Sequence, residues 1–295
     1  MDKVDHIDIF EVAPRDGLQP EPVFIDTQKK IDLINMLNDC GCTRIEVTSF
    51  VNPKWVPQMK DAKEVFQNIE KKLGVIYNAL VPNLKGFELA LDAGFKEVVT
   101  IVSTSESHNK KNLNQSVEET LNQIEEINNI ARAEGVRVRS YIATAFGCPM
   151  EGYAPAKRTL EVALTLEAHG AYEVSIGDTT GMAGPSMAFS IPKEVKDAFT
   201  TANVAVHFHK YYGLEYANNL ASYNAGIRMF DGAVGGLGGC PYAPGAKGNC
   251  ATELLCEMFN RMGVETGIDI EKINETAKYA QSLSTLLHQN NSKTV

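Results

Sequence analysis

The chain has 295 residues, of which 44% are hydrophobic and 22% are charged, as expected for a globular protein with a sizeable core. Its net charge of -9 argues against a nucleic-acid surface, although a local basic cluster could still receive an anionic small ligand. No apolar stretch approaches the roughly 20 residues that span a bilayer, and the first residues contain no secretory signal. Since the six cysteines include no CxxC pair, we expect reduced thiols in a cytoplasmic protein.

Helix-like segments alternate with short β-branched segments along the chain. Segment 26–41 begins with Asp26 as a candidate N-cap, has apolar residues at helical spacing and stops at a glycine. Segment 116–135 opens with a Ser-x-x-Glu capping box and ends at a glycine, and segment 154–170 also ends at a glycine. The predicted strands cover residues 6–12, 44–50, 75–81, 97–103, 137–144, 172–178, 203–209 and 229–236.

Eight strands that alternate with helices predict an α/β fold with a parallel sheet and crossover helices. In a chain of this length, eight such units favour a closed (β/α)8 TIM barrel over an open doubly wound sheet. A glycine fingerprint is absent after the first strand, which also weakens a Rossmann interpretation. We therefore predict one TIM-barrel domain over residues 1–295, with a core from about 6 to 285 and a polar tail at 288–295.

Polar and titratable side chains gather where the predicted strands end. In a TIM barrel the carboxyl ends of the strands form the rim that carries the active site. The residues that the prediction brings to this rim are Glu11, Arg15, Asp16, Glu46, Cys148, Asp178, His207, His209, Cys240 and Asn249.

The pattern His-x-His stands at the end of the seventh predicted strand. Because side chains alternate along a strand, His207 and His209 share one face, while Val206 and Phe208 share the apolar face that packs against the helices. Two core histidines are the alternative, but a pair at a strand end favours metal ligands. Asp16 and Asn249 are the natural oxygen ligands, and such a mixed site suits a divalent ion from Mg²⁺ through Mn²⁺ to Zn²⁺.

Two further features of the rim have both a functional and a structural interpretation. Arg15 beside Asp16 can stabilise negative charge that develops on a substrate oxygen, or it can form a surface ion pair of little consequence. The glycine-rich segment 235–249 can be a mobile lid that brings Cys240 to a substrate, or a loop with an incidental thiol.

Several motifs occur together in this order. They are PRDGLQ (14–19), IEVTSFVNPKWVPQM (45–59), VPNLKGFELA (81–90), SESHNKKN (105–112), FGCPMEG (146–152), GDTTG (177–181), HFH (207–209) and GLGGCPYAPGAKGN (236–249). Together they resemble the 3-hydroxy-3-methylglutaryl-CoA lyases, which belong to the metal-dependent lyases and Claisen-type synthases built on a TIM barrel. The resemblance extends from about residue 7 to about residue 270, and segments 49–59 and 236–249 are its most specific parts.

The resemblance implies a role for each matching residue. It makes Arg15 the group that polarises the substrate carbonyl and Cys240 the catalytic cysteine of a flexible loop. Acidic residues that tune or relay protons in the family correspond to Glu11, Glu46 and Asp178. The residues that match the family's divalent-metal ligands are Asp16, His207, His209 and Asn249.

The implied reaction is cleavage of the acyl-CoA into acetyl-CoA and acetoacetate, with Mg²⁺ or Mn²⁺ as the metal. The CoA phosphates need positive charge, which Lys54, Lys110, Lys111 and Lys247 could supply as a basic rim. Solvated surface lysines are the alternative for each of these four residues. The resemblance also implies a homodimer, and we expect no nucleic-acid or membrane partner.

The chain differs from the family pattern beside two of these motifs. Lys210 and Tyr211 replace the usual Asp-Thr after the His-x-His, and Pro20 and Pro22 replace an asparagine and a lysine after the first strand. A related substrate with a different acyl group is therefore one alternative. A Claisen-type synthase that condenses acetyl-CoA with a 2-oxo acid and a binding protein that has lost catalysis are two others.

Overall fold

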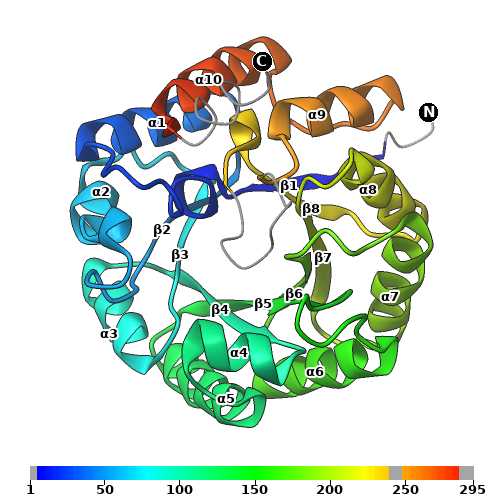
Figure 1. The fold of residues 1–295 in the computed structure, drawn as a ribbon. Helices are drawn as coiled ribbons and strands as arrows, with labels where there is room; N and C mark the ends of the chain where they lie inside the picture. Colours follow the sequence, from blue (N-terminus) through cyan, green and yellow to red (C-terminus); the bar gives the residue numbers. More distant parts are fainter. Residues whose placement is uncertain (1–4, 239–247, 286–295) are drawn as a thin grey trace.

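Eight parallel strands pair in chain order, and the first strand pairs with the last, so that the sheet closes into a barrel (Figure 1). The computed structural model describes residues 5–238 and 248–285. Closure rests on four residue pairs between the first and eighth strands, from Asp8 with Met229 to Glu11 with Gly232. The strands are β1 (Asp8–Glu11), β2 (Arg44–Ser49), β3 (Ile76–Leu80), β4 (Glu97–Ser103), β5 (Arg137–Ala143), β6 (Glu173–Asp178), β7 (Asn203–Phe208) and β8 (Met229–Gly232).

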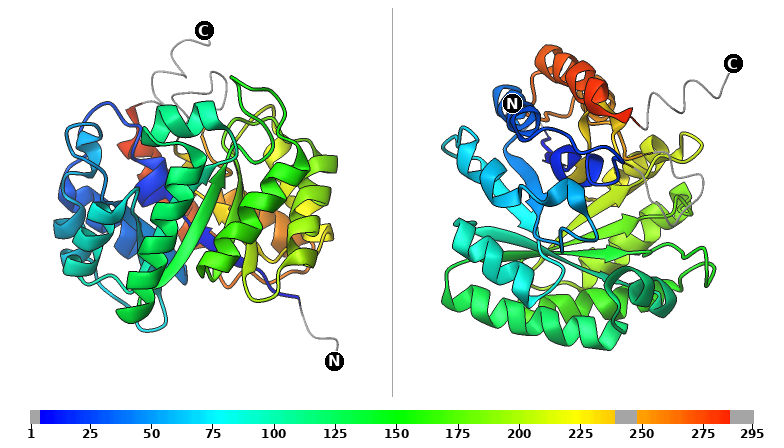
Figure 2. Two further views of the ribbon diagram at one scale, coloured as in Figure 1. Left: turned by 90° about the horizontal axis from the view of Figure 1, so that it is seen from below. Right: turned by 60° about the vertical axis from the view of Figure 1, so that its left-hand side comes forward.

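Helices surround the strands on all sides (Figures 1 and 2), which confirms the predicted single-domain TIM barrel. Short helical turns η1 (Ala13–Gly17), η2 (Pro57–Met59) and η3 (Val234–Gly236) follow β1, β2 and β8. The helices are α1 (Thr27–Asp39), α2 (Ala62–Asn68), α3 (Leu84–Ala93), α4 (Glu106–Leu113), α5 (Val117–Ala133), α6 (Ala156–His169), α7 (Pro185–Ala198), α8 (Leu214–Asn224), α9 (Thr252–Arg261) and α10 (Ile270–Leu283). Within the described ranges, no helix combines the length and apolar character needed to span a membrane.

The helix boundaries follow the signals that the sequence carries. The Asp26 carboxylate accepts a hydrogen bond from the backbone N–H of Gln28 at the start of α1. The predicted capping box is present at the start of α5, where Ser116 and Glu119 each accept a backbone N–H of the other. The α6 helix ends at Gly170, whose φ of 105° lies in the left-handed region that glycine adopts without strain.

The exit from β1 bends sharply and determines where Arg15 and Asp16 lie. In the π-helical turn η1, the carbonyl oxygen of Val12 accepts hydrogen bonds from the N–H groups of Arg15, Asp16 and Gly17. A Cβ on Gly17 would lie 2.9 Å from the Cβ of Leu237, so only glycine allows this approach. The turn therefore holds Asp16 over the rim, close to the segment that follows β8.

Candidate active site

Asp16, His207 and His209 converge at the rim of the barrel. One potential ligand atom from each lies within 4.8 Å of the others. His207 belongs to β7 and His209 follows it directly, so strand alternation places both imidazoles on the inner side. Val206 and Phe208 pack into the hydrophobic core, as the alternation predicted. The structure thus brings together three of the four predicted ligands as one cluster.

Asn249, the fourth predicted ligand, lies beside this cluster. Its amide nitrogen donates to Asp16 Oδ2 at 2.7 Å and to the Leu237 carbonyl oxygen at 3.0 Å. Those two acceptors fix the orientation of the amide, and they leave its Oδ1 buried without a hydrogen-bond partner among the described residues. The Nδ1 atom of His209 is also buried without such a partner. A buried amide oxygen and a buried imidazole nitrogen that lack hydrogen-bond partners, beside an aspartate, suit a divalent cation as its ligands.

The electrostatics of Asp16 and His209 favour the forms that bind a metal. Burial would raise the pKa of Asp16, but the charge of Arg15, together with His207 and the hydrogen bond from Asn249, outweighs it and holds the carboxylate ionised. Burial and the neighbouring His207 lower the pKa of His209 to about 4, so this imidazole is neutral at pH 7. A neutral imidazole and an ionised carboxylate can both coordinate a cation.

His207 is oriented from inside the barrel by Asp231 on β8. Asp231 Oδ2 lies 3.2 Å from His207 Nδ1 and accepts a hydrogen bond from Ser175 at 3.0 Å. Its other oxygen accepts from Arg139 at 2.6 Å, and all of these groups are buried. With Nδ1 engaged in this way, the Nε2 atom of His207 is the one left for a ligand at the rim.

Arg15 is fixed between two carboxylates. It lies 2.5 Å from Asp16 and 2.9 Å from Glu46, and the hydroxyl of Tyr141 donates to Glu46 at 3.2 Å. Burial raises the pKa of Glu46, against the opposing effect of Arg15. Arg15 lines the cavity at the rim, whereas Glu46 does not. We therefore interpret Glu46 as the residue that orients the guanidinium of Arg15.

Glu11 and Asp178 lie behind the rim, where they hold loops in place. Glu11 accepts the N–H groups of Ala13 at 2.8 Å and Val234 at 3.0 Å, together with a hydroxyl hydrogen bond from Thr252 at 2.6 Å. Asp178 accepts the N–H groups of residues 182 and 183, at 2.9 and 3.1 Å. Burial raises the pKa of Asp178 to about 6. Neither carboxylate lines the cavity, so their predicted proton-relay roles stay predictions.

Glu11→Gln is expected to raise the free energy of unfolding by about 2–3 kcal/mol at pH 8. Burial raises the pKa of Glu11 from 4.5 to about 7, so the native state binds the extra proton and loses stability as the pH rises through this interval. Glutamine stays neutral at every pH and keeps an oxygen for the two N–H groups. Near pH 5 the native Glu11 is also neutral, so the difference in stability between the variant and the wild type shrinks towards zero. Urea unfolding of the wild type and the variant at pH 5 and pH 8 measures this difference in the free energy of unfolding. A variant that is less stable than the wild type at both pH values would contradict the prediction.

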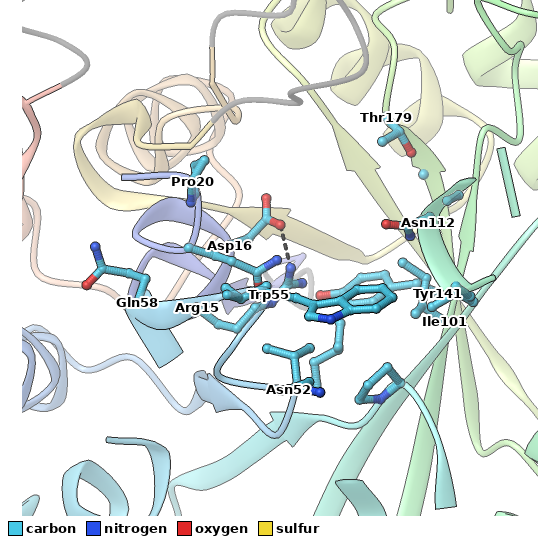
Figure 3. A pocket seen from close by; sticks show the side chains of 18 of the residues that line it. Arg15, Asp16, Pro20, Asn52, Trp55, Gln58, Ile101, Asn112, Tyr141 and Thr179 are labelled. Atoms are coloured by element: carbon cyan, nitrogen blue, oxygen red, sulfur yellow. Dashed lines mark hydrogen bonds and ion pairs between the residues drawn. The ribbon is translucent and has the colours of Figure 1, made fainter. Parts of the chain in front are cut away.

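A cavity of about 860 Å³ lies at the rim and includes the ligand cluster in its wall. Trp55, the only tryptophan of the chain, has 74% of its surface exposed and lies at this cavity. Figure 3 shows Pro20 and Gln58 on one side of the cavity and Asn112 and Thr179 on the other. The wall also includes Arg15, Asp16, Gln19, Asn52, His108, Tyr141, His207 and His209.

The predicted CoA-binding lysines do not line this cavity within the part of the chain that the structure describes. Lys54, Lys110 and Lys111 are exposed, and their neighbours Asn52 and Asn112 are the residues that reach it. Cys240 and Lys247 lie outside the described residues, so their roles stay predictions.

Sequence reasoning missed Asp231, Tyr141 and Trp55. The signal for Asp231 was a single carboxylate within the apolar strand that leads into the glycine-rich segment. Tyr141 stands two residues after Arg139, which places both on the inner face of β5. Trp55 lies within the motif 45–59, and a tryptophan beside strand-end residues is the signal that suggests a ligand contact.

The unusual Lys210 does not disturb the ligand cluster. Its side chain is exposed, and its backbone N–H donates to the Gly248 carbonyl oxygen at 2.8 Å. This hydrogen bond fixes the chain just before Asn249, next to the antiparallel bridge between His209 and Asn249. Lys210 is the feature that suggested a binding protein without catalysis, and it leaves the arrangement of the site intact.

A closed parallel barrel with a ligand cluster at its carboxyl rim defines a TIM-barrel enzyme. The HMGL-like family model matches residues 6–279. The chain belongs to this family.

Characterised relatives match almost the whole chain. A hydroxymethylglutaryl-CoA lyase of Bacillus subtilis is 42% identical over 275 residues, covering 93% of this chain and 92% of that protein. The mitochondrial hydroxymethylglutaryl-CoA lyase of Gallus gallus is 45% identical over 273 residues, covering 92% of each chain. These similarities extend well beyond the rim motifs and include the helices that surround the barrel.

Solved structures agree with this family assignment. The HMG-CoA lyase of Brucella melitensis superposes with a TM-score of 0.91 at 40% identity, covering 95% of this chain and 99% of that one. An HMG-CoA lyase of Acinetobacter baumannii, in complex with coenzyme A and 3-methylmalate, gives a TM-score of 0.91 at 38% identity, covering 95% and 91% of the two chains.

Proposed function

We propose that this protein is a carbon–carbon lyase that cleaves 3-hydroxy-3-methylglutaryl-CoA into acetyl-CoA and acetoacetate with the help of a divalent cation, Mg²⁺ or Mn²⁺. One observation carries the proposal: Asp16, His207 and His209 present their ligand atoms within 4.8 Å of one another in the wall of the rim cavity. The names of the relatives support the substrate, and the coenzyme A complex of one solved relative supports a coenzyme A thioester as the kind of ligand.

Asp16, His207, His209 and Asn249 would hold the cation. A bound divalent ion would supply Lewis acidity that lowers the pKa of the tertiary hydroxyl group of the substrate. Asp231 keeps His207 in the required orientation, and Arg15 together with Asn249 keeps Asp16 in place. The protein thus fixes the ligands before the substrate arrives, which reduces the cost of ordering them during the reaction.

In the cleavage a general base takes the hydroxyl proton, the hydroxyl oxygen becomes the ketone oxygen of acetoacetate, and the bond between the hydroxyl-bearing carbon and the methylene carbon beside the thioester breaks. The electron pair of that bond passes to the thioester, which leaves as the enolate of acetyl-CoA. We assign stabilisation of the enolate oxygen to Arg15, and two observations support this role: its guanidinium lines the cavity, and Glu46 fixes it. The enolate then takes a proton, and we assign that donation to the Cys240 thiol on the resemblance.

Two finer assignments accompany this proposal. We propose a homodimer on family grounds, and a cytoplasmic location because the five cysteines in the described ranges are free thiols. We propose the basic rim for the CoA phosphates on Lys54, Lys110, Lys111 and Lys247, whose charge could meet phosphates outside the cavity.

Incubation of the purified protein with the thioester and Mg²⁺ or Mn²⁺ tests the function. We expect acetyl-CoA and acetoacetate in equal amounts by mass spectrometry, and no cleavage after treatment with a chelator. Intact 3-hydroxy-3-methylglutaryl-CoA and intact close analogues would refute the assignment. A parallel incubation of acetyl-CoA with 2-oxo acids should release no free thiol, whereas thiol release would indicate the synthase.

A further inference from the structure

The segment that follows η1 forms one wall of the cavity. Residues 19–22 line it, and this stretch contains the two prolines that depart from the family pattern. In Figure 3, Pro20 lies above Asp16 on the side of the cavity that also holds Gln58. Pro22 and Val23 are exposed, so burial of apolar surface contributes little to fixing this part of the wall.

Gln58 holds the segment from one side. Its amide nitrogen donates to the carbonyl oxygens of Glu21 at 3.2 Å and Val23 at 2.8 Å. Its amide oxygen accepts the N–H of Ile25 at 2.9 Å. The segment is therefore attached to η2, which forms the end of the motif 45–59 that contains Trp55.

Glu21 holds the segment from the other side, through the end of α10. One carboxylate oxygen accepts both the N–H and the hydroxyl hydrogen bond of Thr285, each at 2.8 Å, and the other oxygen accepts from the Ser284 hydroxyl. Glu21 and Ser284 are buried, at 6% and 2% exposure. We call these three residues the latch. They join positions more than 260 residues apart in the sequence.

We propose that the latch is a positioning device for substrate binding: Glu21 fixes the Gln19–Pro22 wall by anchoring it to the C-terminal end of α10. The inference rests on the proposed function for its substrate. A buried carboxylate with three donors favours one position of the chain, because moving away would leave all of these groups unpaired. The proline rings on both sides of Glu21 restrict the backbone, so a shift at Glu21 is passed on to Pro20 at the cavity.

The physical consequence is a change in affinity rather than in chemistry. Without the latch, the wall would occupy its binding-competent position for only part of the time, and the apparent affinity falls by that fraction. Arg15 and the ligand cluster have their own hydrogen bonds, which the latch does not touch. We therefore expect Glu21→Ala to raise KM about tenfold and to change kcat by less than about twofold.

A double-mutant cycle of Glu21→Ala and Ser284→Ala/Thr285→Val tests the latch. We expect the Ser284/Thr285 variant to raise KM in the same direction, and the combined variant to add little beyond Glu21→Ala. In hydrogen–deuterium exchange, peptides covering residues 18–25 should exchange at least about fivefold faster in every latch variant. The milder Ser284/Thr285 variant keeps the carboxylate and provides the test if Glu21→Ala fails to fold.

Glu167→Ala is the matched control. Its carboxylate accepts the N–H groups of Thr200, Thr201 and Ala202 at 2.7–2.9 Å, so its loss removes a comparable anchor from a loop that does not line the cavity. This control should leave KM and the exchange of residues 18–25 unchanged.

Two results would overturn the latch: unchanged exchange of residues 18–25 in Glu21→Ala, or faster exchange without any rise in KM. A wild-type protein that cleaves no thioester would refute the proposed function, and the exchange of residues 18–25 would then decide the latch by itself.

Discussion

Asp16→Asn is expected to lower kcat for thioester cleavage by about 10³-fold and to weaken Mn²⁺ binding by more than about 100-fold. Asparagine keeps the shape of the side chain but removes the negative charge that balances Arg15 at 2.5 Å. Without that charge, Arg15 would repel a cation, and two neutral imidazoles would have to hold it. The loss therefore combines a missing anionic ligand with a misdirected guanidinium.

Acetoacetate release and calorimetric titration with Mn²⁺ measure these two effects on the same sample. Asp8→Asn is the control, because Asp8 lies at the opposite end of β1, where it is partly exposed and lies 3.5 Å from His6. Retention of kcat within about twofold in Asp16→Asn, with unchanged Mn²⁺ affinity, would show that the carboxylate is not a ligand.

Arg139→Met is expected to lower the free energy of unfolding by about 3–5 kcal/mol. Arg139 is completely buried inside the barrel, 2.5 Å from Glu173 and 2.6 Å from Asp231. Methionine fills similar space but leaves both carboxylates with less compensating charge. Glu173 would keep only Arg44 as a cationic partner, and Asp231 would keep only His207. The uncompensated negative charge dominates the effect, because breaking a buried ion pair costs much more than breaking an exposed one.

Urea denaturation measures this difference, and Arg261→Met in α9 is the matched control. Arg261 also pairs with a glutamate, Glu257, at 2.7 Å, but both side chains are well exposed, so we expect a loss below about 1 kcal/mol. Equal losses in the two variants would contradict a dominant role for the buried charge.

Much of the barrel could be predicted from the sequence, because its signals are local. Strand alternation placed His207 and His209 on one face, and the structure agrees. Capping residues such as Ser116 and Asp26 predicted helix starts within a residue or two. The convergence of Asp16 with the histidines followed from one rule of the fold, that all strands end at the same rim.

The remaining features depend on contacts between distant segments. Nothing near Asp231 in the sequence indicates that it faces Arg139 and His207, because this requires the register of three strands. The latch joins Glu21 to the end of α10, and a short polar pair such as Ser284-Thr285 gives no signal by itself. Charge alone also did not select the cavity residues, since Lys54, Lys110 and Lys111 are exposed while the neighbouring Asn52 and Asn112 line the wall.

The charged interior links the stability of the barrel to its site. Asp231 belongs to the buried network of Arg139 and Glu173, and it also orients His207. The same carboxylate thus compensates a core charge and fixes a candidate metal ligand. This arrangement explains how a group deep in the barrel can determine geometry at the rim.

The most direct test of the account is anomalous diffraction from crystals of the protein grown with Mn²⁺. We expect one strong anomalous peak enclosed by the side chains of Asp16, His207, His209 and Asn249, at the cavity that Arg15 and Trp55 line. A peak elsewhere on the molecule, or imidazoles turned away from Asp16 with no peak between them, would contradict it.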